Sequence, residues 1–354
     1  MSLDARSVAR RLLFWLLMLA LPTGVIVLML GLVSYWTVAK IPIRLSDDPI
    51  IAYDPEIGFV PRPNSRSTRA DSPALTYHIY TDRRGARVSA PGEQTPDQAD
   101  IVFIGDSFTW GHGVENPDTY ASKVPKILGL TGANLALGSY GTTQALQMLR
   151  RNADLRPKLV VYPIITDHLR RNVSACAPSY YPFCADVSYV AVGPAGTPEI
   201  RPPRTNGVDR MYLQVQYEQA GLAPMAWLTH GFDVAIARIA ARAAEYQASR
   251  MSETSALHYL LSELFSTAKD IGADLLVVFI PMAGLEEVPP AVAAAARELK
   301  FDFLDVSEPM RKRGRATELY LPDGHPNAAG HQFIADQIIT ATQRWSRRTQ
   351  GRLP

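Results

Sequence analysis

The sequence predicts an α/β fold, in which a parallel sheet carries helices on both faces and an apolar helix precedes the folded domain. Short apolar runs at 101–104 and 275–280 are typical of strands buried on both sides. Segments with helical spacing at 119–130 and 291–299 follow these runs, so strands and helices alternate along the chain. The third observation is a stretch at 12–39 that contains no charged residue.

Length and composition are those of a globular protein. The chain has 354 residues, of which 47% are hydrophobic and 20% charged, so it can bury a large core. Its net charge of +2 comes from interspersed charges of both signs, which gives no case for a nucleic-acid partner. No internal repeat or low-complexity tract is present.

The apolar stretch at 12–39 predicts a single membrane-spanning helix. Its 28 residues exceed the roughly 20 needed to cross a bilayer, and three arginines in residues 1–11 favour a cytoplasmic N-terminus. A cleaved signal peptide is less favoured, because its apolar region is typically about 7–15 residues long. A buried core helix is weakened by Pro22, Gly24 and Gly31. We therefore expect an uncleaved anchor in the cytoplasmic membrane.

Two cysteines agree with an extracytoplasmic domain. Cys176 and Cys184 lie close together in a loop rich in Pro and Tyr, and such a pair suits a disulfide in an oxidising compartment. Two unrelated free thiols are the alternative. A zinc site is disfavoured because no second pair of nearby Cys or His ligands accompanies them.

Residues 40–97 are polar and contain several prolines, and they predict a linker followed by a small β-rich flap. The alternating pattern at 75–82 indicates a strand, and 83–87 the turn after it. The function of this segment cannot be inferred from the sequence.

The stretch 101–111 is the candidate nucleophile segment. A buried strand ends at Gly105, which permits a sharp turn, and Ser107 follows at the carboxyl edge of the sheet. There its hydroxyl is presented to ligands, and its backbone N–H can help to stabilise an oxyanion. If a histidine partner exists elsewhere in the chain, these features predict acyl-transfer chemistry.

The candidate partners lie at 321–331. Asp323 precedes His325 by two residues in a turn rich in Pro, Gly and Asn, so its carboxylate can reach the imidazole Nδ1–H. That contact would leave Nε2 free to activate Ser107. His112 and His331 are alternatives, but a loop histidine and a histidine at a helix start are more often structural or substrate-contacting.

The remaining segments complete the alternation of strands and helices. Strands are expected at 159–165 and 301–306, and a C-terminal helix at 328–344, before a tail at 346–354. Residues 173–227 form a long irregular insertion, which we expect to shape the substrate site. A further strand is expected at 211–217, and helical stretches are expected at 228–270.

The segment Gly105-Asp106-Ser107, a small-residue turn after Asn134, and Asp323-Gly324-His325 together resemble the SGNH, or GDSL, hydrolases. The resemblance covers residues 98–345 and implies a three-layer α/β/α sandwich. It implies an esterase, lipase, carbohydrate O-acetylesterase or O-acetyltransferase. Many members separate the Asp and His by two residues; the single residue found here also occurs in relatives.

The resemblance also implies oxyanion donors from two further blocks. In the second block the family's Gly position corresponds to Ser139, with Gly138 beside it, and either can supply a backbone N–H. The third block usually contains Gly-x-Asn-Asp, whereas this chain has Thr166 before Asp167, so the Asn is missing. Thr166, His168 or Asn172 could replace it. Losing such a donor cost about 10²–10³ in rate in a studied hydrolase, which weakens the expectation of efficient hydrolysis.

The sequence therefore predicts a membrane-anchored serine esterase. Ser107 attacks an O-acyl ester after His325 takes its proton, Asp323 orients His325, and neither a metal nor a cofactor is required. The expected substrate is an O-acetyl ester on envelope or exported carbohydrate. Two alternatives remain: an O-acetyltransferase of the same fold, and a catalytically weak glycan-binding or assembly protein.

Overall fold

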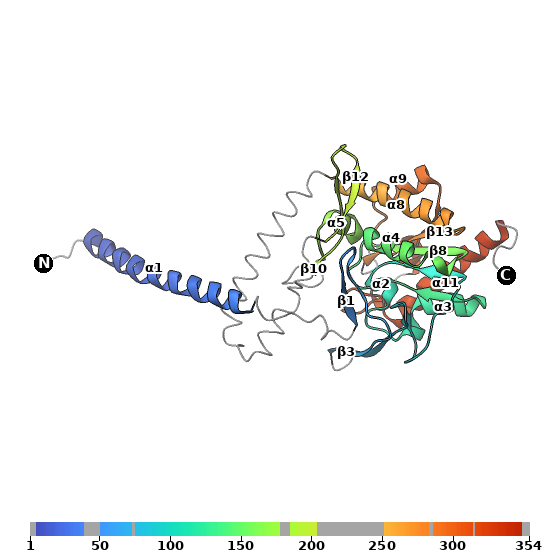
Figure 1. Ribbon diagram of the computed structural model, residues 1–354, viewed down its shortest axis with the longest axis horizontal. Coiled ribbons are helices and arrows are strands. Elements are labelled where there is room, and N and C mark those ends of the chain that lie inside the picture. The colour runs from blue at the N-terminus through green and yellow to red at the C-terminus, as the bar shows by residue number, and fades with distance from the viewer. Residues whose placement is uncertain are drawn as a thin grey trace.

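The centre of the molecule is a five-stranded parallel sheet with strand order β14-β13-β8-β6-β7 (Figure 1). The computed structural model describes residues 5–38, 50–72, 75–177, 185–203, 251–282, 286–313 and 316–348. The strands are β6 (Ile101–Phe103), β7 (Gly132–Asn134), β8 (Leu159–Ile164), β13 (Asp274–Phe279) and β14 (Asp302–Asp305). The expected α/β class is confirmed.

Helices cover both faces of this sheet. On β6, Val102 belongs to one hydrophobic cluster, whereas its neighbours Ile101 and Phe103 belong to a second cluster on the opposite face. The first face carries α4 (Thr142–Arg151), α5 (Asp167–Val173), α8 (Glu253–Asp270) and α9 (Pro290–Leu299). The second face carries α3 (Tyr120–Leu128), α10 (Ser307–Arg313) and α11 (Ala328–Arg348). Because side chains alternate along each strand, both faces are buried, which is why the strands are apolar throughout.

The segment before the sheet forms two small antiparallel units, which we call the flap. They are the hairpin of β1 (Ile51–Asp54) with β2 (Gly58–Pro61), and the sheet of β3 (Arg66–Ser72), β4 (Leu75–Thr81) and β5 (Arg87–Val88). Their buried side chains join the same hydrophobic cluster as α4 and α8. Tyr140 also donates a hydrogen bond to the Phe59 carbonyl, at 2.8 Å. The flap therefore shares a core with the sandwich.

The insertion that follows α5 contains two short hairpins in its described part. They pair β9 (Cys176–Ala177) with β10 (Ala185–Asp186), and β11 (Tyr189–Val192) with β12 (Pro198–Arg201). The expected strand at 211–217 and the expected helix before residue 251 lie outside the described residues. So does Cys184, and the disulfide remains a prediction. Two short helices complete the described fold: α2 (Ser107–Trp110) follows β6, and a 3-10 helix (Ala316–Leu319) precedes the loop with Asp323 and His325.

The N-terminal segment is a single helix, α1 (Ala5–Val38), which Figure 1 draws apart from the sheet. Large apolar side chains between Phe14 and Leu32 are exposed on it. Within the described residues, no helix combines the length and the apolar character that crossing a membrane requires. The transmembrane helix predicted at 12–39 is helical in its described part, as far as Val38, but is not supported as a membrane span.

Candidate active site

The nucleophile segment is a tight turn between β6 and α2. Gly105 has φ +145°, and a Cβ placed on it would lie 2.5 Å from Thr109 Oγ1, so the turn requires glycine. Asp106 caps α2, because its carboxylate accepts from the Phe108 backbone N–H at 3.0 Å. Ser107 is the first residue of α2 and stands at the carboxyl end of the sheet.

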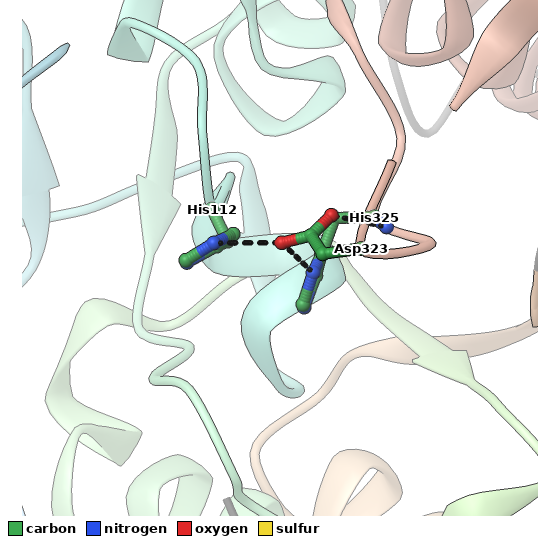
Figure 2. A group of neighbouring side chains, drawn as sticks. All are labelled: His112, Asp323 and His325. Carbon is green, nitrogen blue, oxygen red and sulfur yellow. Dashed lines mark hydrogen bonds and ion pairs between the residues drawn. The ribbon is translucent and has the colours of Figure 1, made fainter. Parts of the chain in front are cut away.

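The structure brings Ser107, His325 and Asp323 together, as the sequence predicts. Ser107 Oγ lies 2.8 Å from His325 Nε2, although the two residues are 218 positions apart in the chain. His325 Nδ1 lies 3.0 Å from Asp323 Oδ2 (Figure 2), and the His325 backbone N–H donates to Asp323 Oδ1 at 3.1 Å. These contacts have the order and the atoms of a hydrolytic triad.

The loop that carries Asp323 and His325 is closed by its own backbone. The Leu321 N–H donates to the His325 carbonyl at 2.7 Å, and the Gly324 N–H donates to the Leu321 carbonyl at 2.9 Å. Gly324 has φ +88°, which favours glycine at this position. The turn folds the Asp323 carboxylate back onto the His325 ring, so a one-residue separation of the two is sufficient.

The charge of Asp323 is stabilised where it stands. Partial burial raises its pKa, but the backbone N–H and imidazole of His325, together with His112, outweigh that effect. The pKa of Asp323 therefore lies below its ordinary value. The carboxylate remains ionised at neutral pH and can stabilise an imidazolium at His325.

Backbone N–H groups of the second block lie beside the nucleophile. A Cβ placed on Gly138 would lie 3.9 Å from Ser107 Cβ, and both Gly138 and Ser139 line the pocket at Ser107. Ser139 has φ +69°, so the backbone turns sharply there. Within the described part of the chain, the N–H groups of Ser107, Gly138 and Ser139 donate to no other protein group. They are available to an oxyanion.

In the third block, Thr166 and Asn172 were the expected oxyanion donors, and the side chains of both are hydrogen-bonded elsewhere. Thr166 Oγ1 donates instead to Glu286 Oε2 at 2.8 Å. Asn172 is buried; its Oδ1 accepts from the Thr142 N–H at 2.8 Å, and its Nδ2 donates to Thr142 Oγ1 at 3.0 Å. Neither residue lines the pocket at Ser107. The structure thus places Thr166 and Asn172 away from the pocket, with the Thr166 hydroxyl bonded to Glu286 and the Asn172 amide bonded to Thr142, and it does not bring either side chain to the position of the missing Asn.

A buried polar network lies behind the nucleophile and was not foreseen from the sequence. Asp106 Oδ2 lies 3.2 Å from both Arg171 Nη1 and His168 Nε2; the His168 contact is close but is not aligned as a hydrogen bond. His168 Nδ1 lies 2.7 Å from the Tyr162 hydroxyl. Burial raises the pKa of Asp106, but His168 and Arg171 outweigh it and leave that pKa below its ordinary value. Burial, in turn, lowers the pKa of His168 below its ordinary value, although Asp106 opposes that shift.

The pocket at Ser107 is bounded partly by the flap. It has a volume of about 340 Å³. Ser107, Asp323, His325, Gly138 and Ser139 form part of its wall. The flap region contributes Ile50, Ile51, Arg69, Tyr77 and Ile79, and the chain after Ser107 contributes Trp110, His112 and Leu137. The flap is thus part of the site, a role that its sequence did not reveal because the contacts join segments distant in the chain.

His112 also belongs to the site. Its Nε2 lies 3.1 Å from Asp323 Oδ2, and its Nδ1 lies 3.3 Å from the Tyr77 hydroxyl. His112, Asp323 and His325 offer three possible metal-ligand atoms within 4.8 Å of one another (Figure 2). Both imidazole nitrogens already lie within about 3.1 Å of Asp323 Oδ2. Two imidazoles and a carboxylate can adopt such distances without an ion between them.

Comparisons with known proteins find distant structural likenesses. Neither a family model nor a curated protein sequence matches the chain. Among solved structures, the acetylxylan esterase Axe2 from Geobacillus stearothermophilus is 13% identical, with a TM-score of 0.39, over 70% of this chain and 96% of that one. The esterase EstA from Pseudoalteromonas sp. is 10% identical, with a TM-score of 0.38, over 70% and 99%. LAE5, an α/β hydrolase from the metagenome of Lake Arreo, is 14% identical, with a TM-score of 0.40, over 69% and 95%.

At this distance, what the chain does has to be inferred from its own site. The parallel sheet, the serine in the turn after β6, the small-residue turn at Gly138 and the Asp323-His325 loop occur in the order that the resemblance implied. In fold and in the arrangement of these segments, the chain is similar to the SGNH hydrolases.

Proposed function

We propose that the protein is a serine ester hydrolase in which Ser107 is the nucleophile. The observation that carries the proposal is the unbroken contact from Ser107 Oγ to His325 Nε2 at 2.8 Å and from His325 Nδ1 to Asp323 Oδ2 at 3.0 Å. A serine hydroxyl is a weak nucleophile until a neighbouring base takes its proton, and this arrangement provides that base with its orienting carboxylate.

The reaction proceeds in two halves. His325 Nε2 takes the Ser107 proton as Oγ attacks the ester carbonyl, and Asp323 stabilises the resulting imidazolium. The N–H groups of Ser107 and of Gly138 or Ser139 hold the oxyanion. His325 then gives its proton to the departing alcohol, which leaves an acyl group on Ser107. Water, activated by His325, releases the acid and restores the hydroxyl.

The substrate that we propose is an O-acetyl ester on envelope or exported carbohydrate. Ser107 is only partly buried and lines a pocket, and His325 and Asp323 are partly exposed beside it, which supports access of an ester on a large substrate. The proposal otherwise follows from the resemblance in the sequence motifs. Release of acetate from acetylated oligosaccharides, compared with release of longer acids from matched esters, tests it; faster turnover of the longer esters contradicts the acetyl assignment.

The nucleophile is tested by labelling the full-length chain with a fluorophosphonate probe and by measuring ester turnover. Wild type should be labelled, and Ser107→Ala and His325→Ala should lose turnover by at least about 10⁴-fold. His258→Ala is a matched control, because His258 pairs with Glu298 on the surface and does not line the pocket. Full turnover by Ser107→Ala would refute the proposal.

An O-acetyltransferase is the second candidate, and the third block favours it. The candidate oxyanion donors at the site are backbone N–H groups. The Asn that the family usually has in the third block is missing, and Thr166 and Asn172 hydrogen-bond elsewhere. A weaker oxyanion site slows attack on the acyl-enzyme by water and by a sugar hydroxyl alike, so a sugar hydroxyl held in place beside the acyl group would gain over water through its fixed position. Partition of the acyl group between water and an added glycan measures this; an unchanged hydrolysis rate and no acylated glycan exclude the transferase.

We also propose that the domain functions outside the cytoplasm, with Cys176 and Cys184 joined. The proximity of the two cysteines in the sequence supports it. Thiol alkylation of the protein isolated from cells, before and after reduction, tests it. Two thiols that react fully without reduction would contradict it.

A further inference from the structure

Two imidazoles share one carboxylate oxygen at the site. Asp323 Oδ2 lies 3.0 Å from His325 Nδ1 and 3.1 Å from His112 Nε2. Figure 2 shows the carboxylate between the two rings, whose centroids are 4.4 Å apart. His112 comes from the segment that follows α2, so the nucleophile turn and the Asp323-His325 loop are joined by a second contact besides that of Ser107 with His325.

One assignment of protons is consistent with these contacts. An ionised carboxylate only accepts, so His325 donates to it through Nδ1, and the His112 Nε2 that lies 3.1 Å from Oδ2, although not aligned there as a hydrogen bond, faces it as the protonated nitrogen. If His112 is neutral and carries its proton on Nε2, its Nδ1 is an acceptor, and the Tyr77 hydroxyl lies 3.3 Å from that atom and can donate to it. His325 with its proton on Nδ1 likewise leaves Nε2 to accept from Ser107. The contacts then run continuously from β4 of the flap to the nucleophile.

The position of Asp323 explains why a contact from outside its own turn matters. Its side chain is 44% exposed, and within the described residues its hydrogen bonds come from His325, only two residues away in the same turn. Such a carboxylate can rotate toward water unless a group outside the turn holds it. His112 is that group, and its ring packs against the ring of His325 as well.

We propose that His112 is a positioning residue, held by Tyr77, that keeps the Asp323 carboxylate directed at His325 Nδ1. The inference rests on the proposed function, since it concerns the same triad. His112 acts through Asp323 and is not a second base, because its Nε2 faces the carboxylate while Ser107 Oγ meets His325. The flap, through Tyr77, therefore contributes to the alignment of the triad.

The test compares variants that keep or remove the donor. His112→Phe keeps a ring but loses the N–H and should lower kcat by about tenfold or more with little change in KM, as expected if the polar nitrogen beside Oδ2 helps to hold the charged carboxylate. His112→Gln keeps an N–H donor and should retain most of the activity. Tyr77→Phe removes only the hydroxyl and should lie between wild type and His112→Phe.

A double-mutant cycle separates positioning from a general structural role. In an Asp323→Ala background the effect of His112→Phe should disappear, because the group through which it acts is gone. The same tenfold loss in that background would overturn the proposal. Equal activities of His112→Phe, His112→Gln and wild type would also overturn it, as would loss of activity on treatment with a metal chelator, which would assign the three side chains to an ion.

A readout independent of turnover distinguishes this inference from the proposed function. The His325 Nδ1–H proton, bonded to Asp323, should give a downfield resonance in wild type that is lost in Asp323→Ala. His112→Phe should broaden or abolish that resonance through faster exchange with water, and His112→Gln should preserve it. An unlabelled, inactive wild type with this pattern would refute the hydrolase but keep the positioning role. An unaltered resonance in His112→Phe refutes the positioning role alone.

Discussion

At the scale of single residues, His331 is an imidazole buried in a site that disfavours its charged form. Its Nδ1 accepts from the Tyr120 N–H at 3.3 Å, and in the described part of the chain its Nε2 has no hydrogen-bond partner. Burial, and then the positive charges of Arg87 and Lys123 together with His325, lower the pKa of His331 to about 3. His331 does not line the pocket at Ser107, and its imidazole is neutral in the folded protein at neutral pH.

This pKa predicts a loss of stability in mild acid. In the unfolded chain His331 titrates near 6.5, so between about pH 6.5 and 3 the unfolded state binds more protons and the free energy of unfolding falls as pH falls. The slope should approach about 1.4 kcal/mol per pH unit. His331→Gln, which retains an acceptor for Tyr120, should flatten it. Urea unfolding of wild type and His331→Gln at pH 7 and pH 5 measures how the free energy of unfolding depends on pH in each protein. Equal slopes in the two proteins would contradict the low pKa of His331.

At the same scale, substitution of Asn172 distinguishes a packing role of the third block from a role in holding the oxyanion. It hydrogen-bonds twice to Thr142 and does not line the pocket. Asn172→Ala should therefore cost about 1–3 kcal/mol of stability, the penalty of leaving buried polar groups unpaired, with little change in turnover per folded molecule. An oxyanion donor would instead cost about 10²–10³ in kcat. Thermal unfolding and steady-state kinetics on the same preparation decide between the two.

At the scale of elements, Arg87 of β5 holds the end of the nucleophile helix α2. Its buried guanidinium donates to the carbonyls of Trp110, Gly111 and Val114. Burial lowers the pKa of Arg87 to about 10, so it remains charged at neutral pH. A cation at the C-terminus of a helix is favoured by the helix dipole and satisfies carbonyls that α2 leaves unpaired.

Arg87→Met should destabilise the protein by about 3 kcal/mol or more, because several buried carbonyls lose their donor. The nucleophile turn should loosen as well, so fluorophosphonate labelling should slow. Arg83→Met is the matched control: Arg83 pairs with exposed Asp97 on the surface, and its loss should change stability by less than about 1 kcal/mol. Melting temperatures of the two variants and wild type give the comparison. Similar effects at both positions would contradict the role of Arg87.

The strands and the individual members of the candidate triad could be predicted from sequence because their signals are local. The apolar run at 101–104 contains β6, and the expected helix at 119–130 contains α3. The spacing of Asp323 and His325 alone suggests an oriented imidazole. The pocket walls and the partners of His112 and His168 could not be inferred, because each depends on how the flap or α5 packs against the nucleophile turn.

At the scale of the whole molecule, α1 presents a continuous apolar surface. Phe14, Trp15, Leu19 and Leu21 are each more than half exposed, and further apolar side chains follow on the next turns. Surfaces of this kind are rarely left in contact with water. We expect the full-length chain to self-associate or to require detergent, and a chain that begins at residue 50 to be monomeric. Size-exclusion chromatography with and without detergent measures this; a full-length monomer in plain buffer contradicts it.

The separation of Ser107 from His325 has a consequence for the newly made protein. The nucleophile and its base are 218 residues apart, and at about 5–20 residues per second the ribosome needs roughly 10–40 s to travel between them. Throughout that interval the growing chain contains the serine but not the group that activates it. On the proposed mechanism, newly made protein becomes able to cleave esters only after the loop with His325 has been synthesised and has docked against the nucleophile turn, which would link the onset of activity to the completion of folding.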